Sequence, residues 1–545
     1  MALLVALPAV PRASAGQRED VVRIGWQWRE RKLVCRGAYA RVRRLADGSL
    51  ALVYGASKNV YIAKSVDGGK TWGKSILVAT DAQGKYDYTN SELAQLAGGR
   101  LVYSWNARPL KDTNLPYKIM LSVSDDGGKT WGVQKTIYTA GTDFHDGCWE
   151  PFVMQLPNGE VQLYYSDEHN IPNERQNISV IRSFDGGNTW GTPEVVSFRS
   201  ISRDGMPVAV WLPDGSGIAM AIEDNGMNGT FKPAIIFTPA SDNWHSGIVD
   251  GESRRRWSAL APSQALPRDV YGGAPYLVAL KGGGTLLSIQ SGEGRRDSDK
   301  LDYALMQVYS GDSHAKDFKA RTTPFANYAN PDVHELWNSL EQIDDNTVMA
   351  VSSLGGIPKR RGIWTVTGKI MRRLESVSSQ SSADFGSSAF IGSASQAYAE
   401  VSSRWDEQTV EFNFCVTDSN IVESDGVELY IRTKKKNIYR ITANAGKHTE
   451  CFRSTDGKWK SVDLPVEFLV GRQSGDKYMI GITVPWKSIG GKPRKGWADV
   501  CFTLNNLDGD NFTRECLAGA DENKPDTWMR CVFPVSRKAV YGLRR

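Results

Sequence analysis

The chain has 545 residues, too many for one ordinary core, which predicts several domains or one large repeat architecture. Its 17 Trp, 20 Tyr, 17 Phe and 53 Gly exclude a disordered chain and favour many short strands joined by tight turns, an all-β protein. A net charge of +5 with scattered basic residues argues against a nucleic-acid partner, and we find no run that is apolar enough to span a membrane.

The first residues contain a short apolar run, MALLVALPAV, followed by Ala13-Ser14-Ala15, a small-x-small pattern typical of a signal-peptidase site. Because no basic segment precedes the apolar run, we interpret residues 1–16 as the remnant of a signal peptide. The alternative is an ordinary apolar N-terminus. We expect a secreted or periplasmic protein.

A short box repeats along the next part of the chain: SVDGGKTWG at 65–73, SDDGGKTW at 124–131 and SFDGGNTW at 183–190. Asp67, Asp126 and Asp185 are spaced 59 residues apart, and each unit contains four alternating strands, as a propeller blade does. Two further units carry degraded boxes, and a sixth lacks its fourth strand, which VVRIGW at 21–26 would supply. The sequence predicts a six-bladed β-propeller over residues 20–373.

The remainder of the chain differs in composition and lacks the repeated box. Residues 374–384 are Ser-rich and predict a linker, and residues 385–545 contain alternating strands without the repeat, which predicts a β-sandwich. Five of the seven cysteines cluster there, so some disulfides are expected, but their pairing is open. No CxxC pair occurs, and we expect no metal and no cofactor.

Topology predicts where the site lies. The boxes fall between the third and fourth strands of each unit, whereas the starts of first strands and the ends of second strands meet at the opposite face. The polar and aromatic residues at those positions are Tyr39, Arg41, Asn90, Glu92, Arg108, Trp149, Glu150, Asp167, Glu168, His169, Arg203, Asp204, Glu223, Asp224, Glu293, Arg295, Arg296, Trp337 and Asn338, with His145 and Asp146 as rim candidates. Carboxylates, arginines and flat rings together suit a sugar.

Two of these residues are predicted to be catalytic. Glu150 in GCWEP and Glu223 in MAIEDNG each adjoin an apolar or aromatic strand and project toward the same mouth. The predicted substrate-binding residues are Arg41, Asn90, Arg108, Trp149, Asp167, Arg203, Asp204, Arg295, Trp337 and Asn338. The arginines could instead be salt-bridged, and Glu92 and Asp204 could be turn or cap acids. The predicted partner is an oligo- or polysaccharide.

The boxes fit SxDxGxTW, and the chain therefore resembles the sialidase-type six-bladed propellers. GCWEPFVMQLPNGEVQLYYSDE and AMAIEDN are similar to glycoside hydrolase family 93, the exo-α-1,5-L-arabinanases, over roughly residues 20–370. This resemblance implies a retaining exo-hydrolase that releases arabinobiose, with Glu150 as nucleophile and Glu223 as acid/base. Such a mechanism requires carboxyl groups about 5–5.5 Å apart.

Two other readings stay open. Sialidases bind a substrate carboxylate with three arginines, and Arg41 resembles the first, but the others are not assignable among Arg203, Arg295 and Arg321. A propeller lectin without catalysis is the third reading.

The last third resembles carbohydrate-binding module family nine through WDEQTVEFNFCVTDSN, DGVELYI and ITVPWKSIG. That resemblance implies Trp459 and Trp528 as possible sugar clamps, and Trp405 and Trp486 as core residues.

Overall fold

The computed structural model describes residues 20–111, 113–171, 175–325, 330–357, 360–379, 387–393, 396–455 and 457–534. Residues 1–16 and residues 380–384 of the predicted linker lie outside this set. The described chain is built of strands with five short 3-10 helices, so the all-β prediction is confirmed. The 3-10 helices are η1 (Trp28–Glu30), η2 (Phe144–Asp146), η3 (Pro262–Gln264), η4 (Trp486–Ile489) and η5 (Pro525–Thr527). Over these same ranges, we find no helix with the length and hydrophobicity needed to cross a membrane.

The part of the chain before residue 372 forms six antiparallel sheets, five of which are made of four consecutive strands. Sheet 1 contains β3 (Ala38–Arg44), β4 (Leu50–Ala56), β5 (Asn59–Ser65) and β6 (Ile76–Ala79). Sheet 2 contains β7 (Tyr86–Gln95), β8 (Leu101–Pro109), β9 (Lys118–Ser124) and β10 (Lys135–Thr139). Sheet 3 contains β11 (Cys148–Gln155), β12 (Val161–Asp167), β13 (Asn177–Ser183) and β14 (Glu194–Ser197).

The other three sheets follow the same order. Sheet 4 contains β15 (Asp204–Trp211), β16 (Gly217–Asp224), β17 (Lys232–Pro239) and β18 (Arg256–Ser258). Sheet 5 contains β19 (Gly272–Ala279), β20 (Thr285–Ser291), β21 (Leu305–Gly311) and β22 (Lys319–Thr322). Sheet 6 contains β23 (His334–Asp344), β24 (Thr347–Gly355) and β25 (Gly362–Met371), and β25 also pairs with β1 (Arg23–Trp26) and β2 (Lys32–Cys35). The expected addition of the VVRIGW strand to this sheet is confirmed.

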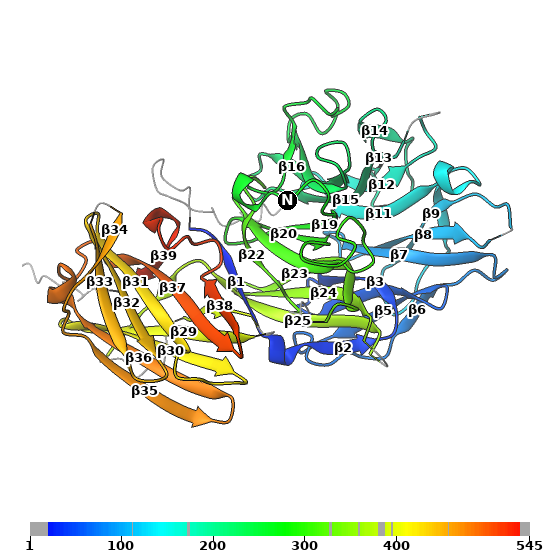
Figure 1. Ribbon diagram of the computed structural model, residues 1–545. Helices are drawn as coiled ribbons and strands as arrows, with labels where there is room; N and C mark the ends of the chain where they lie inside the picture. Colours follow the sequence, from blue (N-terminus) through cyan, green and yellow to red (C-terminus); the bar gives the residue numbers. More distant parts are fainter. Residues whose placement is uncertain are drawn as a thin grey trace, which may run out of the picture.

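The first strands of the six sheets contact one another in a closed cycle. β3 contacts β7, and the contacts continue through β11, β15, β19 and β23 back to β3 (Figure 1). The second strands are buried along nearly their whole length, as in β12 and β16, because each sheet packs between two neighbours. The fourth strands are more exposed: β6 has two exposed and two buried residues, and no residue of β10 is buried. First strands are therefore innermost, and fourth strands form the outer edge.

The repeated box is a turn that its own side chains stabilise. Asp126 lies between β9 and β10, as predicted, and accepts bonds from the Ser124 hydroxyl (2.8 Å), the Thr130 hydroxyl (2.6 Å) and the Thr130 amide (3.0 Å). The Thr130 bonds hold the pKa of the Asp126 carboxyl well below its usual range. The Trp131 ring packs edge-on against Tyr103, 5.5 Å away. The box thus joins two strands and anchors the turn to the core.

The C-terminal part forms two further sheets. One contains β26 (Leu374–Glu375), β39 (Met529–Val532), β37 (Trp497–Asp508), β31 (Gly426–Lys434), β32 (Asn437–Asn444), β33 (Thr449–Thr455), β34 (Lys458–Ser461) and β38 (Asn511–Cys516). The other contains β27 (Val377–Ser378), β28 (Ala389–Gly392), β29 (Ala397–Trp405), β30 (Thr409–Asp418), β36 (Lys477–Pro485) and β35 (Glu467–Ser474). Strands β26 and β27 lie in the predicted linker, so its first residues belong to these sheets.

The two C-terminal sheets share one apolar core, in which the Phe412 and Phe502 rings lie 5.8 Å apart. Trp405 and Trp486 are buried, as expected. Trp528 is only 1% exposed and its indole N–H donates to the Asp521 carbonyl, so it is a core residue and not a surface clamp.

The seven cysteines are all free thiols. The Cys501 and Cys516 sulfurs approach to 3.4 Å without forming a bond, so the structure contains none of the expected C-terminal disulfides. The thiol of Cys501 has a pKa well above its usual value because of its contact with Cys516 and its burial.

Candidate active site

Every innermost strand carries a β-bulge at the same place in its sheet, and β23 has a second irregularity between Gln342 and Asp344. At each bulge a non-glycine residue has a positive φ, which costs on the order of 1 kcal/mol or more. These bulge residues are Tyr39 (53°), Asn90 (53°), Glu150 (46°), Met206 (52°), Ala274 (46°) and Trp337 (57°). Four of them, from sheets 1, 4, 5 and 6, pack in one cluster, so the bulges converge at the centre of the cycle.

Each bulge faces a position near the end of the second strand of the preceding sheet, which we call the latch position. Within its own sheet, each latch residue on the second strand pairs with the first-strand residue that directly precedes the bulge residue. The six latch residues are Gly55, Asn106, Ser166, Glu223, Gln290 and Ser353. In four cases the latch side chain accepts the bulge amide: Ser353 from Tyr39 (3.0 Å), Ser166 from Met206 (2.9 Å), Glu223 from Ala274 (2.8 Å) and Gln290 from Trp337 (2.8 Å). Neighbouring sheets are thus bonded around the centre, and the predicted catalytic Glu223 is one of the acceptors.

The structure brings the two predicted catalytic carboxyls into electrostatic contact. The pKa of Glu150 is raised to about 7, chiefly by burial and also by the Glu223 charge, against the lowering effects of Arg108 and Arg203. Burial also raises the pKa of Glu223, against the bond from the Ala274 amide and the charge of Arg203. One carboxyl is therefore partly protonated at neutral pH, and the other has a hydrogen bond that favours its anion.

Two glycines make room for the Glu223 carboxylate. A Cβ on Gly273 would lie 2.5 Å from Glu223 Oε2 and 2.4 Å from the Tyr271 hydroxyl. A Cβ on Gly205 would lie 3.1 Å from Glu223 Oε1 and 2.5 Å from Gln176 Oε1. No side chain larger than glycine fits at Gly273 unless the carboxylate moves.

Tyr271 is a site residue that the sequence did not reveal, because it precedes β19 in a loop and has no motif. Gln290 Nε2 donates to its hydroxyl oxygen at 3.0 Å, which leaves the phenol proton for another acceptor. Burial, together with the Glu223 and Glu150 charges, raises the pKa of Tyr271 well above its usual value. The phenol is therefore a neutral donor beside the carboxyl pair.

Two predicted arginines flank the pair. Arg108 lies 3.7 Å from Glu150 Oε1, donates to Asn90 Oδ1 at 2.7 Å, and stacks 4.8 Å from the centre of the Trp149 ring. Arg203 lies 3.4 Å from Glu168 Oε1. The side chains of Arg108 and Arg203 are 35% and 33% exposed, so both reach solvent at the mouth.

Trp149 supports the site from behind and is not a sugar platform. It is only 4% exposed, and its indole N–H donates to Glu168 Oε2 at 2.8 Å. Its ring packs 4.7 Å from that of Tyr117. The exposed aromatic surface at the bulges comes instead from Trp337, which packs 5.8 Å from Tyr39.

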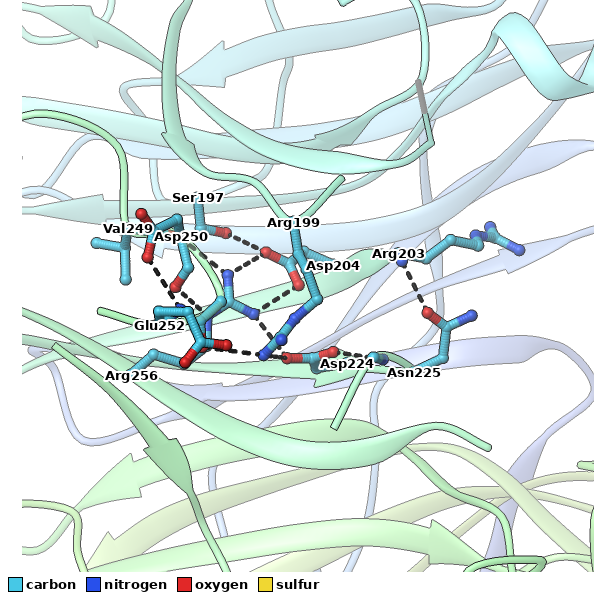
Figure 2. A network of polar contacts seen from close by, with 12 residues as sticks. Ser197, Arg199, Arg203, Asp204, Asp224, Asn225, Val249, Asp250, Glu252 and Arg256 are labelled. Carbon is cyan, nitrogen blue, oxygen red and sulfur yellow. Dashed lines mark hydrogen bonds and ion pairs between the residues drawn. The ribbon is translucent and has the colours of Figure 1, made fainter. Parts of the chain in front are cut away.

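Asp204 is closed inside a buried ion cluster and does not face the pocket. Arg256 bonds Asp204 Oδ1 and Asp224 Oδ2, both at 2.7 Å, and Ser197 donates to Asp204 Oδ2 at 2.9 Å. Neither aspartate has exposed surface. Figure 2 shows this cluster, with the Arg203 side chain directed away from it. The predicted substrate contact of Asp204 is replaced by a structural role between β15, β16 and β18.

Other predicted binding residues are also buried. Arg41 is 3% exposed, donates to the carbonyls of Ala40 and Trp337, and lies beneath the Tyr39 ring. Arg295 bonds the carbonyl of Tyr303 (3.0 Å). Asp167 and Asn338 are buried as well, at 0% and 1% exposed, and Arg295 is as exposed as Glu223, at 9%.

Several of the other predicted residues are held in ion pairs, among them the rim candidate Asp146. Glu92 pairs with Arg43 at 3.0 Å, Glu293 with Arg321, and Arg296 with Asp332 at 2.9 Å. His169 Nδ1 lies 2.8 Å from Asp146 Oδ1, and His145 precedes that aspartate in η2. Over the described ranges no three His, Cys, Asp or Glu side chains are grouped as metal ligands would be.

The comparisons with known proteins gave one family match, over residues 99–210, to the BNR repeat-like domain. No curated protein matches the chain. Among solved structures, the GH93 α-L-arabinofuranosidase of Fusarium graminearum with arabinobiose is 20% identical, covers 65% of this chain and 98% of its own, and has a TM-score of 0.47. The α-L-arabinanase of Penicillium chrysogenum with arabinobiose is 18% identical over 65% of this chain and 99% of its own, with a TM-score of 0.48. The NanB sialidase of Streptococcus pneumoniae is 10% identical over 63% and 70%, with a TM-score of 0.42.

Proposed function

We propose that the protein is a retaining exo-glycoside hydrolase whose catalytic pair is Glu150 and Glu223. The observation that carries this proposal is a buried carboxyl with a pKa of about 7 beside a second carboxyl that accepts a backbone amide. Glycoside hydrolysis requires two such groups in different protonation states. The first substrate to test is α-1,5-L-arabinan, as the motif resemblance implies.

The proposal includes the architecture that presents this pair. The closed cycle of six sheets supports a six-bladed propeller, and the shared core of the C-terminal sheets supports a β-sandwich. Carbohydrate binding by that sandwich rests on the sequence resemblance alone. Export fits the small-residue pattern at residues 13–15. The buried state of Arg41 argues against the arginine triad of a sialidase.

The electrostatics favour roles opposite to those that the resemblance implies. Glu150 is the proton donor, because its pKa of about 7 keeps part of the population protonated at neutral pH. We assign Glu223 as the nucleophile, because the Ala274 amide and the Arg203 charge favour its anion against the burial that raises its pKa. The Tyr271 phenol donates toward the pair without losing its proton.

The test is hydrolysis of linear α-1,5-arabinan and of a sialoside, with the products separated by chromatography. We expect arabinobiose, and we expect Glu150→Gln and Glu223→Gln each to lower kcat by about 10²- to 10⁴-fold. Glu400→Gln, at an exposed position in β29, is the matched control. Unchanged hydrolysis in both site variants would exclude the pair. Sugar binding without hydrolysis of either glycan would support the lectin reading.

Azide rescue separates the two roles. With an activated arabinoside, Glu150→Ala plus azide should give a glycosyl azide of retained configuration, and Glu223→Ala plus azide one of inverted configuration. The reverse pattern would restore the roles that the resemblance implies.

A further inference from the structure

A hollow lies between sheets 1, 2 and 6. It has a volume of about 560 Å³ and is lined by the strand ends around β3, β4, β7 and β23. Its charged and aromatic lining comes from Arg36, Lys58, Asp87, His334, Trp337 and Arg361. It lies at the same ends of the first and second strands as the bulges.

The hollow has an excess of positive charge. Arg36, Lys58 and Arg361 are exposed, and among the described residues none of the three has an ion-pair partner. Asp87 is the one carboxylate in the lining, and burial raises its pKa although Arg108 and Lys58 oppose the rise. Burial and the Arg361 charge lower the pKa of His334. Three cations facing one carboxylate attract an anion.

Residues that line the hollow are in contact with, or next in sequence to, residues around the carboxyl pair. Trp337 lines the hollow and packs against Tyr39, a fellow bulge residue whose pKa the Glu150 charge raises. On the other side Thr89 lines the hollow, and the next residue, Asn90, accepts a bond from Arg108 beside Glu150. A sugar bound at the pair would therefore direct its next residue or a substituent into the hollow.

We propose that this hollow binds an anionic group of the carbohydrate, a carboxylate or a sulfate ester, on the sugar at or next to the bond that is cleaved. The proposal rests on the proposed glycosidase function. It adds to that function a preference for glycans that carry an acidic substituent at or next to the cleaved bond, over the same glycans without one. Arg36 and Arg361 supply planar donors that match either group, and Lys58 supplies a point charge.

The experiment measures binding of monosaccharides that the enzyme does not hydrolyse, by calorimetry on the full chain. The anionic probes are glucuronate, galacturonate and glucose 6-sulfate, and the neutral probes are glucose, galactose and arabinose. We expect at least one anionic probe to bind about tenfold or more tightly than its neutral counterpart, and 0.5 M NaCl to remove most of the difference. Preference for the uronates identifies a carboxylate site, and preference for the sulfate identifies a sulfate site.

A triple variant, Arg36→Gln, Lys58→Gln and Arg361→Gln, should lose that preference. The matched control is Lys70→Gln, Lys74→Gln and Lys129→Gln, which removes the same charge near the boxes. Equal affinity for charged and neutral probes, no binding of any anionic probe, or an unchanged triple variant would each overturn the inference. If the protein hydrolyses neutral arabinan but shows no preference for anionic probes, the proposed function stands and the anion site is excluded. If it binds the anionic probes but hydrolyses no glycan, the anion site stands and the proposed function is excluded.

Discussion

Replacing Glu150 with glutamine should stabilise the protein at alkaline pH and leave its stability nearly unchanged under acid conditions. The folded state raises the pKa of this carboxyl from 4.5 to about 7, so the folded state holds the proton more tightly than the unfolded chain does. Between these values the folded state binds more protons, and stability falls as the pH rises. Each pKa unit is worth about 1.4 kcal/mol, so above pH 7 the charged carboxyl costs the fold about 3 kcal/mol. Glutamine keeps the shape and cannot ionise.

The assay is urea unfolding of wild type and Glu150→Gln at pH 4 and pH 8, followed by tryptophan fluorescence. We expect nearly equal midpoints at pH 4 and a higher midpoint for the variant at pH 8. Glu400→Gln, on an exposed side chain, should show no such divergence. A Glu150→Gln effect of the same size at both pH values would refute the reasoning, because it would mean that packing and not ionisation separates the proteins.

Three further predictions test other parts of the site. Gly273→Ala should fold and lose most of its kcat, because its Cβ would lie 2.5 Å from Glu223 Oε2; full activity would show that the carboxylate tolerates displacement. Tyr271→Phe should lower kcat more than it raises KM, and it should move the acid limb of the pH–rate profile. An unshifted profile would show that the phenol contributes packing only. Asp126→Ala should lower the melting temperature with kcat unchanged, because its bonds close a turn far from the pair, and normal melting with lost activity would contradict this.

Repetition made much of the fold predictable. The boxes fix the register of the units because Ser124, Asp126 and Thr130 must bond one another across a single turn, and such local bonds depend on spacing alone. The alternation of apolar residues then located the strands between boxes. The fourth-strand gap of sheet 6 pointed to residues 21–26, which do pair with β25.

The bulges were not predictable, and they decide which side chains face the centre. The residues at positive φ range from Ala274 to Trp337 in size and include the polar Asn90 and Glu150. No residue type is common to them, so the conformation comes from packing around the centre and not from local preference. Arg41 and Asp204 occupy strand ends, as the sequence suggested. Their bonds to a carbonyl and to Arg256, respectively, come from residues distant in the chain, which no local pattern reports.

The latch position recurs in all six sheets, and in four of them its side chain accepts the bulge amide of the next sheet. The same hydrogen bond between sheets is made by Ser166, Gln290 and Ser353 as by Glu223. Among the six latch residues, Glu223 alone is a carboxylate. Acquiring a reactive acid at such a position needs one codon change and preserves the bond between sheets. A carboxylate could therefore occupy the latch position of another sheet without loss of the bond between sheets. Gln290→Glu, for example, would place a carboxylate in sheet 5, next to the sheet that carries Glu223.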